Sequence, residues 1–416
     1  MEEIVKILGF QTGHDVSYCV LENGIPVIHE ELERFTREKE PFGDGLTFAL
    51  DSLGEKVNDI KYFSLGNFGM YQPRGIVKWR HKGCYNEKIV KKMKKIASKN
   101  GGQFYEVGHH LSHAANAFFT SDFDESLIVT IDGGGQESDK KHGQRATSFT
   151  IAYGKENVVK QLKVYSMDDI NLGKVWDSVT SEVFGLSTGY PRGNQAGSVM
   201  AMATMGEPKY FKKFNRGHRN VTNGKKVTKK MKRIDYEELY DIANISEQES
   251  FNVAASLQKF TEEMVKKYVA DYVEEYQPKN VCFSGGVSLN CVMMGKFKSW
   301  VDCVENVFCD PVPYDAGLSL GSARYVWHTI LGNPRIKNKP ENKTSYLGRD
   351  YTKDVIIDAV LKGKGDLTFE EVKDDVVLSL LSKNKIISVF GGKSESGRRA
   401  LGNRAILANP KTDKIK

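Results

Sequence analysis

The sequence predicts an α/β protein in which one unit occurs twice, with a cleft between the two copies. A strand, a polar turn with a glycine and a hairpin of strands occupy the first thirty residues, and the same order returns roughly 120 residues later. Segments with apolar residues at three- and four-residue spacing follow each copy, which is typical of helices packed on a sheet. A repeated plan of strands and helices predicts two similar halves that face each other.

The first copy begins with EIVKILGF at residues 3–10, which predicts a strand that ends at the polar turn QTGHD. VSYCVL at 16–21 and IPVIHEE at 25–31 follow as two further strands. The turn ENG separates them, which is typical of a hairpin.

The second copy begins with ESLIVTIDGGG at residues 125–135, a strand that ends at Asp132 and a run of glycines. Residues 146–166 predict two more strands around a Gly-Lys turn. NVCFSGGVSLN at 280–290 then predicts a buried strand, two glycines and the start of a helix, whose free N–H groups suit a phosphate. A last unit of strand, loop and helix places Asp315 on a loop beside that turn.

Composition indicates an ordinary folded protein of two or three domains, with 416 residues and 40% hydrophobic residues. We find no N-terminal signal pattern and no apolar run near the roughly 20 residues that span a bilayer, so we expect a cytoplasmic protein without a membrane segment. The six cysteines include no CxxC pair, which favours reduced packing residues over disulfides or a thiolate metal site.

Two segments are strongly basic. Residues 208–233 hold eleven Lys or Arg and no acid, and residues 72–100 hold ten bases against Glu87. Such runs are usually solvated loops or helix faces, but they could also form a track for a polyanion such as nucleic acid.

The stretch GHHLSHAANAFF at residues 108–119 predicts a helix with His109 and His113 on one face. This spacing lets two imidazoles reach one ion, although an HxxxH pair also arises by chance. His110 turns about 100° away and is expected outside any coordination sphere. Asp132 and Asp315, at strand ends that would face the cleft, are candidates for further ligands.

Several ordered motifs are similar to those of the NodU/TobZ-type O-carbamoyltransferases. They are LGFQTGHDVS, EELERFTREK, GHHLSHAANAFF, LIVTIDGGG, NVAASLQ, FSGGVSLN, PYDAGLSLGSA and SESGRRALGNRAILANP. The resemblance implies the duplicated, RNase H-like fold of actin and the sugar kinases for residues 1–335, with halves at about 1–125 and 126–335. It also implies a linker at 336–344 and part of a YrdC-like α/β domain at 345–416.

The same resemblance implies roles for individual residues. His109, His113 and Asp315 match ligands of a divalent metal of the iron type, with Asp132 as a further ligand or phosphate contact. His14 matches a base for the acceptor hydroxyl, and Lys39 a contact to the carbamoyl donor. The positions expected to bind the adenine nucleotide and other anionic groups are Asp132, Gly133, Gly134, Gly285, Gly286, Asn290, Glu395, Arg399, Asn403 and Arg404.

The implied activity is ATP-dependent transfer of a carbamoyl group from carbamoyl phosphate, through carbamoyladenylate, to a hydroxyl. Adenylation supplies a good leaving group, a metal polarises the transferring unit, and His14 removes the hydroxyl proton. The acceptor is either a small sugar-like metabolite or a hydroxymethylated pyrimidine of DNA. The alternatives are a sugar-kinase-like phosphotransferase and a nucleotide- and metal-binding subunit that depends on a partner.

The sequence departs from the family pattern at several positions. Ser198 stands where the family has lysine, Asn252 where it has an acid, Arg398 where it has proline and Ala405 where it has serine. Family members also continue for more than a hundred residues after the last motif. We therefore expect either a fragment or a second chain that completes the C-terminal lobe.

Overall fold

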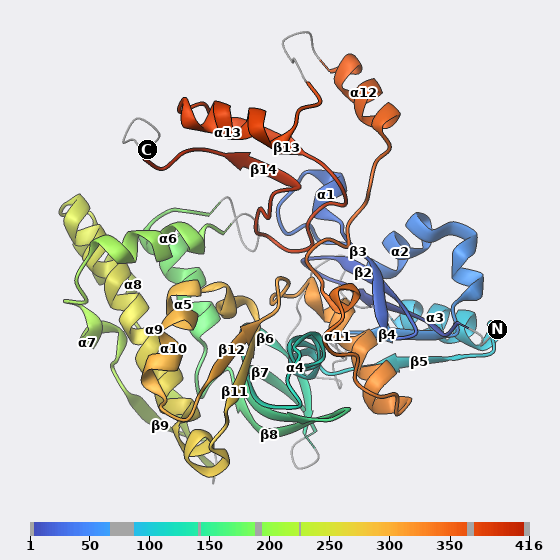
Figure 1. The fold of residues 1–416 in the computed structure, drawn as a ribbon. Helices are drawn as coiled ribbons and strands as arrows, with labels where there is room; N and C mark the ends of the chain where they lie inside the picture. Colours follow the sequence, from blue (N-terminus) through green and yellow to red (C-terminus); the bar gives the residue numbers. More distant parts are fainter. Residues whose placement is uncertain are drawn as a thin grey trace.

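The protein is described by a computed structural model that covers residues 4–66, 87–139, 143–187, 194–223, 226–363 and 370–411. Two five-stranded sheets form its centre (Figure 1). The first sheet contains β1 (Lys6–Gln11), β2 (Ser17–Glu22), β3 (Ile25–Glu31), β4 (Tyr62–Leu65) and β5 (Gln103–Glu106). The second contains β6 (Glu125–Asp139), β7 (Gly143–Lys155), β8 (Val158–Ser166), β11 (Asn280–Ser284) and β12 (Asn306–Cys309).

The two sheets have the same topology. The first has the order β3-β2-β1-β4-β5, and the second has β8-β7-β6-β11-β12 when read in the same direction. In the first sheet β1, β2 and β3 are antiparallel neighbours, and β4 and β5 run parallel to β1. In the second sheet β6, β7 and β8 are antiparallel neighbours, and β11 and β12 run parallel to β6. This repeat confirms the predicted duplicated α/β fold, whereas the exact domain limits stay predictions.

Helices cover both faces of each sheet. Those that lie along the chain before β6 are α1 (Glu33–Thr36), α2 (Gly45–Leu53), α3 (Glu87–Lys99) and α4 (His109–Thr120). Those from residue 172 to residue 325 are α5 (Leu172–Ser178), α6 (Ala196–Met202), α7 (Phe211–Phe214), α8 (Tyr236–Ala243), α9 (Glu247–Tyr276), α10 (Cys291–Phe297) and α11 (Gly317–Tyr325).

Shorter elements complete this part of the chain. They are the 3-10 turns η1 (Gly54–Asp59), η3 (Ala203–Met205), η4 (Gly286–Leu289) and η5 (Lys298–Trp300), the π turns η2 (Val179–Val183) and η6 (Val326–Ile330), and the hairpin β9 (His218–Asn223) and β10 (Lys226–Met231).

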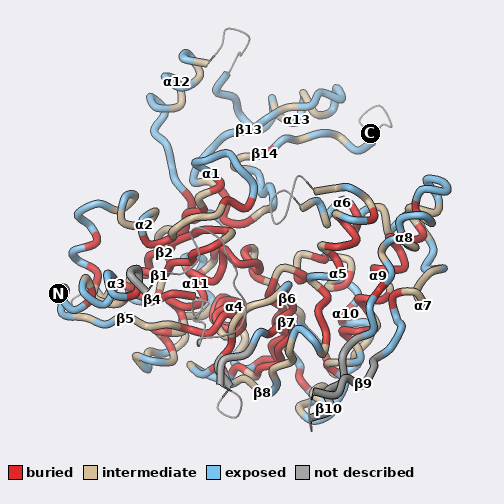
Figure 2. The backbone as a smooth tube through the Cα atoms, turned by 180° about the vertical axis from the view of Figure 1, so that it is seen from behind, coloured by how far each residue is buried: buried red, intermediate tan, exposed pale blue. Residues whose placement is uncertain are grey.

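The strands alternate between two buried environments, as the period of two in a strand requires. In β1, Leu8 and Phe10 join a core with α2 and α3, whereas Ile7 faces the core around α11. In β6, Ile131 packs toward α5, α9 and α10, whereas Ile128 packs toward α4. Figure 2 shows the buried residues concentrated in these layers. Both sheets are therefore buried on both faces.

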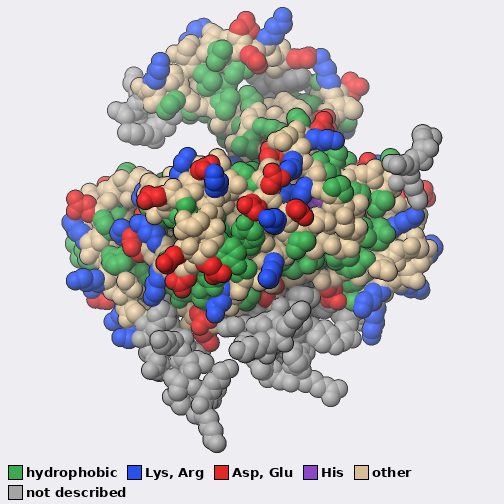
Figure 3. All heavy atoms as spheres, turned by 60° about the horizontal axis from the view of Figure 1, so that its bottom comes forward, with side chains coloured by type: hydrophobic (Ala, Val, Ile, Leu, Met, Phe, Trp, Pro, Cys, Tyr) green, Lys and Arg blue, Asp and Glu red, His purple; other side chains and the backbone are tan. Residues whose placement is uncertain are grey.

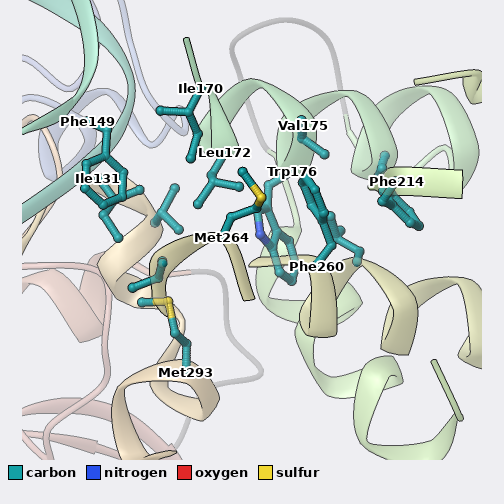
Figure 4. Close-up of a cluster of buried hydrophobic side chains, with 14 of the residues drawn as sticks. Ile131, Phe149, Ile170, Leu172, Val175, Trp176, Phe214, Phe260, Met264 and Met293 are labelled. Atoms are coloured by element: carbon teal, nitrogen blue, oxygen red, sulfur yellow. The ribbon is translucent and has the colours of Figure 1, made fainter. Parts of the chain in front are cut away.

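The largest hydrophobic core lies between the second sheet and α5, α9 and α10. Trp176 of α5 packs there among apolar side chains of β6, β7 and α9, with Met264 beside it (Figure 4). The indole Nε1 donates to Thr261 Oγ1 at 2.9 Å, which satisfies the polar atom that this large side chain brings into the core. This core packs on one face of β6, the central strand of the second sheet and the strand that carries Asp132.

Helices α4 and α11 lie between the two sheets, where α4 packs on the second sheet and α11 on the first. They approach each other closely because α11 has a glycine at the crossing. A Cβ atom on Gly321 would lie 1.9 Å from the carbonyl oxygen of Ser112 in α4. The close contact holds the histidines of α4 beside the loop that leads into α11.

The linker and the C-terminal segment differ in how closely they pack on the body of the protein. Asn342 of η7 (Pro340–Asn342) is fully buried and accepts from Arg324, so the polar linker is docked on the body. The segment beyond it contains α12 (Lys353–Lys362), α13 (Asp374–Ser382), β13 (Ile387–Phe390) and β14 (Arg404–Leu407). All described residues of α12 and α13 are at least partly exposed, and a hollow separates part of the segment from the body (Figure 3).

We expect Gly321→Ala to lower the thermal unfolding midpoint, because its methyl group forces α4 and α11 apart at a cost of about 1–3 kcal/mol. Gly295→Ala in α10 is the matched control, since a Cβ there meets open space. Alanine in an exposed helix position should stabilise by about 0.5–1 kcal/mol. Equal unfolding midpoints for the two variants, measured by circular dichroism, would contradict a tight crossing of α4 and α11.

Candidate functional site

Four buried side chains meet between the two sheets. His109 and His113 come from α4, Asp132 from the middle of β6, and Asp315 from the loop before α11. The sequence predicts a strand that ends at Asp132, but β6 continues to Asp139, and its pairing with β7 is only interrupted between Ile131 and Gly135. One ligand atom from each of the four side chains lies within 4.8 Å of the others. His109 Nε2 is 3.1 Å from Asp132 Oδ2, and His113 Nε2 is 3.4 Å from Asp315 Oδ1. Sequence reasoning named all four residues, and the fold brings them together.

Local geometry aims both histidines at this point. His109 and His113 are separated by about one helical turn, and their ring centroids lie 4.8 Å apart. The ring of His109 packs on Gly135 of β6, where a Cβ atom would lie 2.1 Å from His109 Cγ. His110 points to the other side, where its Nδ1 lies 2.8 Å from Thr150 Oγ1. The middle histidine is thus outside the cluster, as the helical period predicts.

Glu137 fixes the end of α4 that carries His109. The N-cap residue Gly108 has no side chain to cap the helix, and Glu137 Oε1 accepts from the backbone N–H of Leu111 at 3.0 Å. Glu137 is almost fully buried, and its burial raises the pKa of the carboxyl. A carboxylate at the positive end of a helix is stabilising. Sequence reasoning missed this residue, because only the pairing of β6 beside α4 brings it to the helix.

The cluster fits a divalent metal ion. His113 Nε2, which faces Asp315, is buried and has no hydrogen-bond partner among the described residues, a state that is unfavourable unless something else binds it. Two imidazoles and two carboxylates are a ligand set that suits iron, zinc and similar metals. Ser284 Oγ lies 3.5 Å from His113 Nδ1, where a hydrogen bond would orient the ring.

The charges of the cluster are unbalanced without a cation. Burial opposes ionisation of Asp132, but the hydrogen bond from His109 and the nearby imidazoles hold its pKa well below the ordinary value. Burial likewise opposes protonation of His109, yet Asp315 and Asp132 together raise its pKa. Both shifts favour a positive charge placed between the carboxylates.

His14 lies at the rim of this cluster. Its Nε2 is 3.4 Å from Asp315 Oδ2, and its Nδ1 is 2.9 Å from Asp15 Oδ2. Burial lowers the pKa of His14, but the carboxylates of Asp315, Asp15 and Asp132 outweigh it and raise the pKa to about 10. The imidazole is 43% exposed, so an incoming molecule can reach it.

The glycine turns predicted to bind a nucleotide lie next to Asp132. Asp132 Oδ1 accepts from the backbone N–H of Gly286 at 2.9 Å, and Gly285 has a positive φ of 88° that favours glycine. The carbonyl of Gly133 accepts from Asn171, and Gly134 lies in the irregular part of β6 that follows Asp132. The same carboxylate therefore belongs to the cluster and to the glycine turn.

A second detail differs from the sequence expectation. The 3-10 helix η4 begins at the second glycine, Gly286, whereas α10 starts only at Cys291, so the α-helix does not begin directly at the two glycines. Asn290 caps α10 by accepting from Met293 N, and its amide donates to Gln258. The N–H of Gly286 is likewise engaged by Asp132, because the carboxylate lies within reach of the tight turn.

Lys39 lies elsewhere, in a cavity of about 660 Å³ between α1 and the C-terminal segment. Arg34, Arg37, Arg399 and Arg404 also line it, together with Glu30, Glu31, Glu33, Glu38 and Glu395. The lining is therefore of mixed charge, and an anionic ligand would bind at its arginines. The cavity is one of the places where the C-terminal motif meets the body.

The polar residues of the last motif mainly hold its own loop. Glu395 Oε1 accepts from the backbone N–H groups of Leu401, Asn403 and Arg404. Asn403 donates to the carbonyl of Lys393, and Arg404 donates to those of Gly391 and Gly392. Arg399 instead reaches across to the carbonyl of Leu289, next to the glycine turn.

Two residues near His14 carried no role in the sequence interpretation. Asp15 follows His14 directly, and its carboxylate also contacts Arg398, 383 residues away in the chain. The signals in the sequence were the acid beside the histidine and an arginine at a position where the resemblance expects proline.

Other expectations concern regions that the structure covers only in part. Lys225, residues 67–86 and Cys84 lie outside the described residues, so the basic runs are only partly placed. Five further cysteines, Cys19, Cys282, Cys291, Cys303 and Cys309, are free. Among the described helices, none combines the length and apolarity required to cross a membrane.

Family comparisons match most of the chain. The family model "Carbamoyltransferase N-terminus" matches residues 73–324, and "Carbamoyltransferase C-terminus" matches residues 378–416. The first match alone covers more than half of the 416 residues. It includes His109, His113, Asp132 and Asp315, and therefore the whole metal-ligand cluster.

Three curated relatives are similar over long stretches. An uncharacterized protein of Synechocystis sp. is 27% identical over 96% of this chain and 70% of its own length. The nodulation protein NolNO of Sinorhizobium fredii is 29% identical over 73% of this chain and 43% of its own. The 3'-hydroxymethylcephem-O-carbamoyltransferase of Amycolatopsis lactamdurans is 22% identical over 97% and 73%, respectively. The chain therefore belongs to the carbamoyltransferase family and is a transferase of carbamoyl groups.

Proposed function

We propose that the protein is an ATP-dependent O-carbamoyltransferase that uses carbamoyl phosphate, passes through carbamoyladenylate and carbamoylates an acceptor hydroxyl. The observation that carries this proposal is the buried cluster of His109, His113, Asp132 and Asp315 with His14 at its rim. A sugar-kinase-like phosphotransferase would need the glycine turns but not two buried imidazoles that face two carboxylates. The family membership supports carbamoyl transfer over phosphoryl transfer.

A divalent ion of the iron type would supply positive charge that polarises the transferring group and offsets its phosphate. In this chain His109, His113 and Asp315 would hold it, with Asp132 as a fourth ligand or a phosphate contact. Asp132 also fixes Gly286, so the glycine turn and the cluster keep one relative position. We propose Gly133, Gly134, Gly285, Gly286 and Asn290 as the nucleotide-binding positions.

His14 would act as the base. When its Nδ1–H donates to Asp15, its Nε2 carries the free lone pair and faces the cluster, ready to accept the proton of a hydroxyl. A raised pKa keeps the ring protonated in the metal-free chain. Positive charge beside Asp315 would offset the carboxylate that raises this pKa, and would thereby release the proton from Nε2.

Lys39 and the cavity around it are the proposed donor side. Lys39, Arg34, Arg37, Arg399 and Arg404 line the cavity and would bind the phosphates of carbamoyl phosphate or ATP. Glu395 and Asn403 would act by holding the loop that carries Arg399 and Arg404.

The acceptor would be a small sugar-like metabolite, which the half-exposed position of His14 allows. A hydroxymethylated pyrimidine in DNA is the second candidate, and the basic run at 208–233 is the feature that favours it. A base in duplex DNA would have to be extruded or single-stranded to reach His14.

A second chain that completes the C-terminal lobe is a further part of the proposal. The apolar side chains of Leu361, Leu378, Ile386 and Ile406 are largely exposed on this segment and would be available to such a chain. If such a chain is required for adenylation, the purified protein should bind metal but release little pyrophosphate from ATP and carbamoyl phosphate. Rapid pyrophosphate release by the isolated chain would contradict a required partner.

We expect His109→Ala and His113→Ala to abolish high-affinity metal binding, because each removes one ligand of the cluster. His110→Gln is the matched control, since His110 contacts Thr150 and lies on the other side of α4. Metal content after dialysis, measured by elemental analysis on folded protein, reports the result. Equal loss of metal in all three variants would contradict the assignment.

Metal binding should release protons and weaken in acid. The pKa of His109 is raised in the metal-free chain, so below that pKa a proton occupies the nitrogen that the metal needs. The dissociation constant should rise by up to about tenfold per pH unit for each displaced proton. Calorimetric titrations in buffers with different ionisation enthalpies measure the protons directly, and a pH-independent affinity would exclude His109 as a ligand.

We expect the protein, incubated with carbamoyl phosphate, ATP, iron and a hydroxyl acceptor, and with the second chain if adenylation requires it, to add one HNCO unit to that acceptor, as detected by mass spectrometry. His14→Gln should lower turnover by about a hundredfold or more while metal affinity stays the same. Sugar-like acceptors and single-stranded DNA with hydroxymethylated pyrimidines form the two arms of the assay. A phosphate added in place of the carbamoyl group would identify a phosphotransferase and overturn the proposal.

A further inference from the structure

Arg398 reaches from the loop between β13 and β14 into the wall of the cleft. Its Nη2 lies 2.6 Å from Asp15 Oδ1, and its Nη1 lies 2.7 Å from Glu40 Oε1. The guanidinium also stacks over the ring of Tyr314, 4.4 Å from the centroid. One side chain of the C-terminal segment thus binds two carboxylates of the first sheet's loops and one aromatic ring.

Asp15 joins this arginine to the predicted base. Its Oδ1 contacts Arg398, while its Oδ2 contacts His14 Nδ1 at 2.9 Å. With both oxygens engaged, the carboxylate has one orientation, and the imidazole is aligned so that Nε2 faces Asp315 at 3.4 Å. The contacts form a continuous path from the C-terminal segment to the metal-ligand cluster.

The two acids that contact Arg398, Asp15 and Glu40, both have an unusual backbone conformation. Asp15 and Glu40 have φ values of 52° and 50°, in the left-handed region that residues other than glycine rarely adopt. Such conformations persist where surrounding contacts hold them, and they gather at functional sites. Both carboxylates are buried, so loss of Arg398 would leave them without their partner.

Neighbouring contacts dock the same loop on the body. Glu31 Oε1 accepts from Gly397 N at 2.8 Å, and Arg34 donates to the carbonyl of Gly397. Tyr314, under the guanidinium, donates to Glu31 Oε2 at 2.6 Å. The position of Arg398 therefore depends on docking of the C-terminal segment.

We propose that Arg398 is a positioning residue that orients His14 through Asp15, so that the base is aligned only while the C-terminal segment is docked. The role of His14 as the base rests on the proposed function, whereas the alignment itself does not. Proline, which the family resemblance expects at this position, offers no such contact. Lysine could not place two nitrogens on Asp15 and Glu40 in the geometry of a guanidinium.

The test measures the ring of His14 directly. Protein with ¹⁵N-labelled histidine and bound Zn²⁺ as a diamagnetic probe gives nitrogen signals that report tautomer and hydrogen bonding, and His14→Gln assigns those of His14. Arg398→Ala and Asp15→Asn should change the His14 signals in the same way, and the double variant should add no further change. Arg349→Ala is the matched control, because Arg349 joins the same segment to Glu30 at 3.0 Å without contacting Asp15; it should leave His14 unchanged.

Two further measurements separate alignment from collapse of the site. The Zn²⁺ affinity of Arg398→Ala should match that of the parent protein. Its thermal unfolding midpoint should fall, because Asp15 and Glu40 lose a buried partner, and the spectra are therefore recorded well below that midpoint. Carbamoyl transfer should fall by about tenfold to a hundredfold in kcat with little change in the acceptor KM, as for loss of a group that orients a catalytic side chain. If Arg398→Ala does not fold, Arg398→Gln provides the same comparison.

The outcomes are distinct. His14 signals that stay unchanged in a folded Arg398 variant, while Asp15→Asn changes them, would overturn the proposal and leave Arg398 as a docking contact. Failure of the parent protein to transfer a carbamoyl group, although it releases pyrophosphate from ATP and carbamoyl phosphate, would refute the proposed function instead, and the nitrogen signals would still decide whether Arg398 positions His14.

Discussion

The close crossing of α4 and α11 is the constraint on which the site depends. Each helix follows one half of the chain and packs on the sheet formed by the other half, and Gly321 allows their backbones to touch at Ser112. Because Asp315 lies at the entrance to α11 and both histidines lie on α4, this single contact sets the distances within the cluster. A duplicated fold provides a cleft, but only close helix packing turns it into a site with four converging ligand atoms.

The charges of the buried side chains determine which ions the site favours. Asp132 and Asp315 are buried, and burial of two carboxylates is unfavourable unless positive charge or hydrogen bonds compensate them. In the metal-free chain the nearby carboxylates raise the pKa of His109 and of His14, so these imidazoles take up protons. The arrangement is therefore poised to exchange protons for a cation, and the same exchange would prepare His14 to accept a proton from a hydroxyl. Metal binding and base activation are thus linked through Asp315.

Features that depend on local periodicity could be predicted from the sequence. These features are the duplicated strands, the helix at 108–119 and the opposite directions of His109 and His110, all of which depend on residues close in the chain. Contacts that only packing creates could not be predicted in this way. Glu137 reaches Leu111 because β6 lies beside α4, and Arg398 reaches Asp15 across 383 residues. The delayed start of α10 has a similar origin, since Asp132 engages the turn at Gly286 from another strand.

The C-terminal segment combines a firmly docked loop with weakly buried secondary structure. Glu395 organises the loop from within, while Glu31 and Arg398 hold it against the body. In contrast, α12 and α13 contribute few buried side chains, so their stability depends little on packing against the body. Movement of these helices would therefore cost less than release of the loop. The loop is consequently the part of the segment able to transmit its position to Asp15, and the charged path through Arg398 gives that position a direct effect on His14.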